Sequence, residues 1–250
     1  MNTTTFSLQG KCYLGVRNAQ GQPASMIFLD NAPSLKLALT STVKEHQESM
    51  TGQRIVDDRL IVGKKCDLTL ELDKWNPQNL ALALYGASNV VAGGSATGEA
   101  FPPMLNAGDY VRLNNPNVSA LAITDSTAGT PKTVAAADYA LTSANAGVVQ
   151  MINVTPYVQP FKAAYTYAGQ TDINMFTQPA PEKFLLFDGI NTINNAPVVV
   201  ELYRVRFDPL KELDLIIDDY AKMQLTGSAL YDPLNASNGV LGGFGRIRAQ

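Results

Sequence analysis

The chain has 250 residues, of which 46% are hydrophobic and only 16% are charged, and its formal net charge is −3 at pH 7. The slight negative balance argues against a general nucleic-acid binder, which needs a basic surface. A single histidine and two cysteines far apart in the sequence do not supply the four clustered ligands of a structural zinc site.

The N-terminal segment predicts neither export nor membrane insertion. Residues 1–10 lack the basic start and the apolar stretch of a signal peptide, and no segment is long and apolar enough to predict a transmembrane helix.

Cys12 and Cys66 occupy apolar positions of strand-like segments, outside any C-x-x-C motif. We therefore expect both thiols to be buried and free. We also expect no metal, cofactor or membrane as partner.

Alternation of apolar and polar residues recurs along the chain and predicts half-buried β-strands. The clearest segments are 11–17, 25–30, 34–43, 65–73, 118–124, 161–168, 183–188, 198–207 and 221–230. Asn and Gly residues between the first two segments predict a hairpin. The fold class is therefore mainly β.

Residues 76–86 interrupt the alternation and predict one short α-helix. Asn76 is suited to the N-cap, Pro77 to the first helical position, and Gly86 to the C-terminal stop. Leu80 begins an apolar face on the helix. The segment 208–219 is ambiguous, since Asp-Pro can start a helical turn while its alternating Leu and Ile residues fit a strand.

The middle of the chain differs in composition from its ends. The Gly- and Ser-rich stretch 86–108 is typical of an extended loop or linker. Turn-rich strand segments follow, and we interpret the region around 109–168 as a candidate inserted β-module within a single β domain of residues 1–250.

No segment carries a catalytic motif. His46 lies in a soft polar stretch without a Gly-x-Ser-x-Gly elbow, so we interpret it as a solvated or interface residue. The glycines of 93–101 lack the following Lys-Ser/Thr of a phosphate loop. We therefore expect that the protein is not an enzyme.

A row of polar residues shares one face of the segment 65–73, opposite its leucines. The row consists of Asp67, Thr69, Glu71 and Asp73. Such a uniform row does not provide the two different environments that a hydrolytic carboxylate pair needs. A solvated sheet face and an acidic wall that repels phosphates remain the two interpretations.

Between two strand segments lies a polar stretch, 44–58, that predicts a long loop. Its charged, amide and flexible apolar side chains are suited to contacts with another copy, and we expect it to become ordered only on assembly. The candidate contact residues are Lys44, Glu45, His46, Gln47, Glu48, Met50, Gln53 and Arg54. An ordinary exposed hairpin loop is the alternative.

Three stretches together resemble the tail tube (major tail) proteins of long-tailed bacteriophages. They are "GQPASMIFLDNAPSLKLALTSTVKEHQESMTGQR", "KKCDLTLELDKWNPQNLALALYG" and "FLLFDGINTINNAPVVVELYRVRFDPLKELDLI". The resemblance covers about 10–86 and 183–230. It implies a β-sandwich or barrel of the tail-tube type, with the helix at about 76–86 as its flank and the loop at about 44–58 contacting the adjacent ring.

The resemblance also implies a function and partners. Subunits would form hexameric rings that stack into a hollow tube, with the tape measure, terminator and baseplate or tip proteins as further partners. DNA would pass through the lumen without specific binding, and the row at 67–73 would face that lumen. The protein would lie in the virion tail, after assembly in the cytoplasm of the host bacterium.

Two other readings stay open. One is a β-sandwich module of a virion that binds carbohydrate or a receptor, although Trp75 stands alone rather than in an aromatic cluster. The other is the tube subunit of a contractile tail or a secretion system, which is built on a similar subunit.

Overall fold

The computed structural model describes residues 5–249. The fold is mainly β, as the sequence predicted, with several sheets and no closed barrel within the described residues. The chain forms two compact units, one made of residues up to Ser88 and from Ile173 onward, the other of Asn89–Asp172. Strands β5 (Ser88–Val91) and β12 (Gln170–Ile173) pair where the chain passes from one unit to the other.

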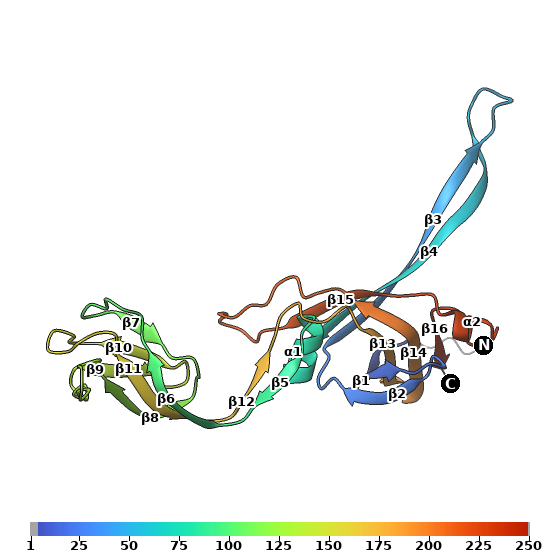
Figure 1. Ribbon diagram of the computed structural model, residues 1–250. Helices are drawn as coiled ribbons and strands as arrows, with labels where there is room; N and C mark the ends of the chain where they lie inside the picture. Colours follow the sequence, from blue (N-terminus) through green and yellow to red (C-terminus); the bar gives the residue numbers. More distant parts are fainter. Residues whose placement is uncertain (1–4, 250) are drawn as a thin grey trace. The chain divides into compact units, whose positions relative to one another are not determined.

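The first unit is built on one antiparallel sheet, with the strand order β2-β1-β13-β14-β15-β4-β3 and β16 paired to β14 (Figure 1). Its strands are β1 (Leu8–Arg17), β2 (Pro23–Phe28), β3 (Ser34–Gln47), β4 (Val56–Leu72), β13 (Glu182–Asn191), β14 (Ala196–Phe207), β15 (Met223–Ala229) and β16 (Gly245–Ala249). Strands β2 and β3 form the two ends of this order, and β16 is a further edge strand. The candidate site lies at the β3 edge.

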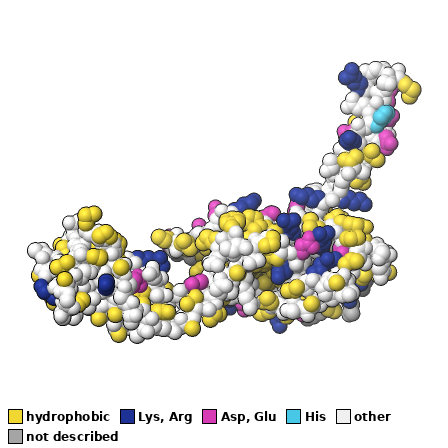
Figure 2. Space-filling model, viewed as in Figure 1, with side chains coloured by type: hydrophobic (Ala, Val, Ile, Leu, Met, Phe, Trp, Pro, Cys, Tyr) yellow, Lys and Arg dark blue, Asp and Glu magenta, His cyan; other side chains and the backbone are white. Residues whose placement is uncertain are grey.

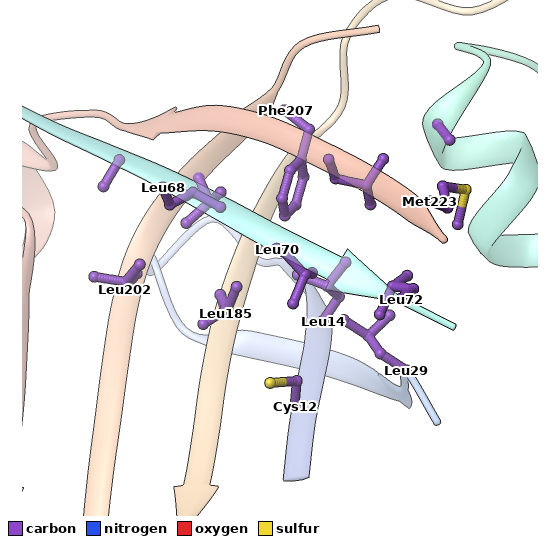
Figure 3. Close-up of a cluster of buried hydrophobic side chains, with 14 of the residues drawn as sticks. Cys12, Leu14, Leu29, Leu68, Leu70, Leu72, Leu185, Leu202, Phe207 and Met223 are labelled. Carbon is purple, nitrogen blue, oxygen red and sulfur yellow. The ribbon is translucent and has the colours of Figure 1, made fainter. Parts of the chain in front are cut away.

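The core of this unit lies under the last third of β4. Leu68, Leu70 and Leu72 alternate with polar residues and point to one side, where they meet Leu185 and Leu202 (Figure 3). Burying a leucine side chain contributes about 1.5–3 kcal/mol, so this end of the strand is firmly held.

Both cysteines are buried free thiols, as predicted. Cys12 lies on β1 and Cys66 on β4, and both belong to the same hydrophobic cluster. Desolvation by burial raises the pKa of the Cys12 thiol to about 11.

Helix α1 (Pro77–Ala83) begins where the sequence predicted. The Asn76 side chain accepts a hydrogen bond from the backbone N–H of Asn79 at 2.8 Å, and Pro77 follows the cap. The helix ends earlier than the predicted limit of 86, because Tyr85 adopts the left-handed conformation with φ 51°. A second short helix, α2 (Pro233–Ala236), was not predicted; Asp232 caps it.

The second unit contains two three-stranded sheets, ordered β7-β10-β9 and β6-β11-β8. Its strands are β6 (Gly94–Ala100), β7 (Tyr110–Arg112), β8 (Val118–Thr124), β9 (Tyr139–Ser143), β10 (Val148–Met151) and β11 (Lys162–Tyr167). Residues of both sheets share one core around Phe161. The expectation that 86–108 is loop was wrong, since β5 and β6 lie within it.

The segment between β14 and β15 is neither helix nor strand. Residues 208–222 form a loop, which resolves the ambiguity of the sequence pattern there. Leu215, Ile216 and Ile217 of this loop are exposed.

Candidate functional site

The most distinctive feature of the first unit is the hairpin of β3 and β4, which is much longer than the core beneath it. The two strands pair from Ser34 opposite Glu71 to Gln47 opposite Val56. Figure 1 shows the far part of this hairpin extending away from the sheet. Register shifts after Thr42 and after His46 mark β-bulges, which increase the local twist.

The predicted long loop at 44–58 is wrong in extent. Residues up to Gln47 belong to β3 and residues from Val56 belong to β4, so only 48–55 connect the strands. The polar residues at 44–47 remain in the ladder because each lies opposite a β4 residue. The two strands of the hairpin belong to the same chain, and its ordering on assembly stays a prediction.

Glu48 holds the tip of the hairpin. Its carboxylate accepts hydrogen bonds from the backbone N–H of Met50 at 2.8 Å and of Thr51 at 2.9 Å, and from the Thr51 hydroxyl. The hydrogen bond from the Thr51 hydroxyl is the main reason that the pKa of Glu48 lies below its ordinary value. Gly52 supplies a positive φ of 75° in this turn.

Two ionic contacts connect the strands just below the tip. Nδ1 of His46 lies 2.5 Å from Oδ1 of Asp57, and Nε of Arg59 lies 3.4 Å from Oε1 of Glu45. The hydrogen bond to Asp57 raises the pKa of His46, and the same bond lowers the pKa of Asp57. Asp57 and Arg59 were not predicted as site residues. They are identified by their pairing across the two strands, and this pairing becomes visible only when the register of the strands is known.

The hairpin exposes large apolar side chains along its length, from its base to its tip. Leu39 is 79% exposed, Leu60 is 64% exposed and Met50 is 91% exposed. Ile55, Val56, Ile61 and Val62 are exposed as well. Exposed apolar side chains therefore recur along the hairpin on both of its faces.

The predicted contact residues all lie on the far part of the hairpin, from Lys44 to Arg54. The first four, Lys44 to Gln47, are exposed on β3, while Met50, Gln53 and Arg54 are exposed in the turn and Glu48 is half-buried. Figure 2 shows hydrophobic and charged side chains interspersed along the hairpin. The surface therefore combines apolar area with charges of both signs.

Among the described residues, the sheet has free edges at β2 and β3, and also at β16, which pairs only with β14. Within residues 5–249, β2 pairs only with β1 and β3 pairs only with β4. Such edges present backbone N–H and C=O groups to which a strand of another chain can bind.

The predicted polar row lies on the face of β4 that points away from the core. Asp67, Thr69 and Glu71 are half-buried there, and Asp73 follows the end of the strand. The face is mixed in charge, because Lys65 lies on it and Lys36 of β3 is directly opposite Thr69.

Hydrogen bonds fix these carboxylates. Nζ of Lys65 lies 2.8 Å from Oδ2 of Asp67, and the Ser228 hydroxyl donates to Oδ1 at 2.6 Å. The bond from Lys65, followed by that from Ser228, lowers the pKa of Asp67. The carboxylate of Asp73 accepts a hydrogen bond from the Asn31 amide. These hydrogen bonds hold the carboxylates of Asp67 and Asp73 in place.

Across residues 5–249, no group of three or more His, Cys, Asp and Glu side chains is arranged to hold a metal ion. In the part of the chain that the structure describes, no helix has the length and apolar character needed to cross a bilayer.

Comparison with curated proteins finds no match for this chain. A family match covers almost its whole length, from residue 5 to residue 248. The chain belongs to the family described as protein of unknown function UCP028589.

Proposed function

We propose that this chain is the structural subunit of a phage tail tube, which forms hexameric rings that stack into a hollow tube for DNA ejection. The observation that carries the proposal is the β3–β4 hairpin, which exposes Leu39 near its base and Met50 and Leu60 further out. The resemblance of three sequence stretches to tail tube proteins supplies the kind of assembly and the number of subunits.

Ring formation uses the free edges at β2 and β3. Strand β2 of one subunit and β3 of its neighbour each lack a second partner among the described residues. Contact between these edges would satisfy exposed backbone groups and continue the sheet from subunit to subunit.

Ring stacking uses the hairpin. A contact between two different surfaces of identical subunits stays open unless a rotation closes it, so it propagates a filament. The hairpin reaches the adjacent ring, where its apolar side chains become buried and the charged residues near its tip select the register. The exposed residues Lys44 to Arg54 make these contacts.

The polar face of β4 lines the lumen. Asp67, Glu71 and Asp73 lie on this face, and a channel with little excess of cations lets DNA slide, because binding to phosphates requires cations. The tube belongs to the virion tail and is completed by tape measure, terminator and baseplate or tip proteins.

Negative-stain electron microscopy of the purified chain at high concentration tests this proposal. We expect tubes with a central channel, and their loss when Leu39 and Leu60 are both replaced by Ser. The matched control is Ile193→Ser, at an exposed position in the β13–β14 turn, which should leave the tubes intact. A chain that stays monomeric at every concentration contradicts the proposal.

A further inference from the structure

The loop between β14 and β15 carries an apolar ridge edged by acids. The ridge, Leu215 to Ile217, is followed by Asp218 and Asp219 and preceded by Asp214, and all of these side chains are exposed. Ile216 is 98% exposed. No basic residue lies within 214–220, so this stretch is both apolar and negatively charged.

At the base of the hairpin lies an open groove of about 530 Å³ with the opposite charge. Ile61, Val62 and Lys64 of β4 form one wall. The rings of Tyr231 and Phe244 form the other wall, in an edge-to-face arrangement with centroids 6.3 Å apart.

The groove is preformed and carries a free cation. The backbone N–H of Asp232 donates to the carbonyl of Gly243 at 2.7 Å, which ties the two segments that bear the rings. Over residues 5–249, Lys64 makes no ion pair, whereas the neighbouring Lys65 is paired with Asp67. Lys64 is therefore available to an acidic partner.

Ridge and groove lie at opposite ends of the same pair of strands. The ridge borders the Leu72 end of β4, where Leu72 pairs with Met223 at the start of β15. The groove lies beyond the pairing of Cys66 with Ala229, at the other end of β15. Six residues of extended strand span about 20 Å, so a subunit cannot place its own ridge in its own groove.

We propose that the acidic ridge of one copy docks in the hairpin-base groove of a second copy. Leu215 to Ile217 fill the apolar walls, and Asp218 pairs with Lys64. Because the two surfaces lie at opposite ends of the sheet, the contact is head-to-tail and fixes the polarity of the assembly. This inference rests on the proposed self-assembly and adds the residues of one specific contact to it.

Disulfide cross-linking of the full chain tests the contact. Cysteines replace Val62 in the groove and Ile216 in the ridge of the same chain, while the native thiols remain buried. An intramolecular disulfide is excluded, since it requires Cα atoms within about 7 Å. We expect mild oxidation to produce a ladder of multimers. The control combines Val62→Cys with Ile193→Cys, which should stay monomeric on a denaturing gel.

A charge exchange provides the second measurement. Lys64→Glu and Asp218→Lys should each abolish the assembly seen by microscopy, and the double variant should restore it. If tubes form but the two cysteines do not cross-link, and neither charge reversal affects assembly, this contact is overturned while the tube function stands. Cross-linked chains without tubes retain the contact and overturn the tube. Monomers in both experiments overturn both proposals.

Discussion

Nη2 of Arg17 lies 2.5 Å from Oδ1 of Asp232, which joins two residues 215 positions apart in the sequence. The Asp232 carboxylate is fully buried and also accepts hydrogen bonds from the Asn235 amide at 2.7 Å and from the backbone N–H of Leu234 at 3.1 Å. This one carboxylate therefore caps helix α2 and fastens it to the end of β1.

Asp232→Asn should lower the free energy of unfolding by about 3 kcal/mol, because removing one partner of a buried ion pair leaves the other charge uncompensated. Urea denaturation followed by circular dichroism measures the change. The control is Asp188→Asn, an exposed carboxylate without an ion pair in the described structure, for which we expect a change within about 0.5 kcal/mol. Equal effects of the two substitutions would contradict the stabilising role of the Arg17–Asp232 ion pair.

The same pair predicts a dependence on pH. Burial alone would raise the pKa of Asp232, but the hydrogen bonds from Arg17 and Asn235 outweigh it and lower the pKa below its ordinary value. A depressed pKa contributes stability above the unfolded pKa of about 3.9, and that contribution is lost as the pH falls through the folded value. The stability advantage of the wild type over Asp232→Asn should therefore shrink below about pH 4.

Gly86→Ala should destabilise the first unit. A Cβ at Gly86 would lie 1.6 Å from the carbonyl oxygen of Asn174, which is backbone and cannot move aside cheaply. Overpacking of this kind costs about 1–3 kcal/mol. Gly239→Ala is the matched control, since nothing lies within 4 Å of its added Cβ. Unfolding midpoints in urea that fall equally for both variants would rule out the close approach as the cause.

This glycine shows why the helix was predicted well at one end only. The start of α1 depends on neighbours in sequence, Asn76 and Pro77, and such local signals are readable without a structure. Gly86 was expected to provide a left-handed stop, but Tyr85 takes that conformation. The need for Gly86 comes instead from Asn174, a residue far along the chain, and a single sequence does not reveal such a contact.

In the candidate site too, the sequence reveals features that depend on neighbouring residues and misses those that depend on contacts between distant segments. Period-2 alternation correctly separated Leu68 and Leu70 from Asp67 and Glu71, because parity along one strand is local. The charge balance of that face depends on Lys36, which lies on another strand in a register fixed by the fold. For the same reason the extent of the hairpin was misjudged: its polar residues read as loop until their cross-strand partners are known.

His46 should titrate above its ordinary pKa of about 6.5. The hydrogen bond to Asp57 is the main cause, and the charges of Asp57 and Asp58 act in the same direction. A raised pKa means that the contact stabilises the tip fully at low pH and loses this effect as the pH rises through the folded pKa. Because the chain has one histidine, NMR of selectively labelled imidazole follows it directly.

Two neighbouring aspartates provide the comparison for this titration. Asp57→Asn removes the hydrogen bond and should return the pKa of His46 most of the way to its ordinary value. Asp58→Asn removes only a Coulombic contribution and should lower the pKa less. An equal decrease in both variants would mean that general charge, rather than the bond to Asp57, determines the titration.

In the proposed tube, reversing the charge of the polar face should cause the tube to retain DNA. Replacing Asp67, Glu71 and Asp73 by Lys adds three cations to a face that already carries Lys36 and Lys65. Phosphates release condensed counterions when they bind such cations, so retention should weaken steeply as the salt concentration rises. Purified tubes incubated with short duplex DNA, then separated by sedimentation, measure the retained fraction.

The control for this face is the neutral triple variant Asp67→Asn, Glu71→Gln and Asp73→Asn. It removes the same three negative charges without adding cations. If phosphate binding requires added cations, the neutral tubes should retain far less DNA than the Lys tubes, although the existing lysines then lack part of their counter-charge. Lys tubes that form normally and retain no more DNA than the wild type would mean that DNA does not reach this face, which contradicts its place in the lumen.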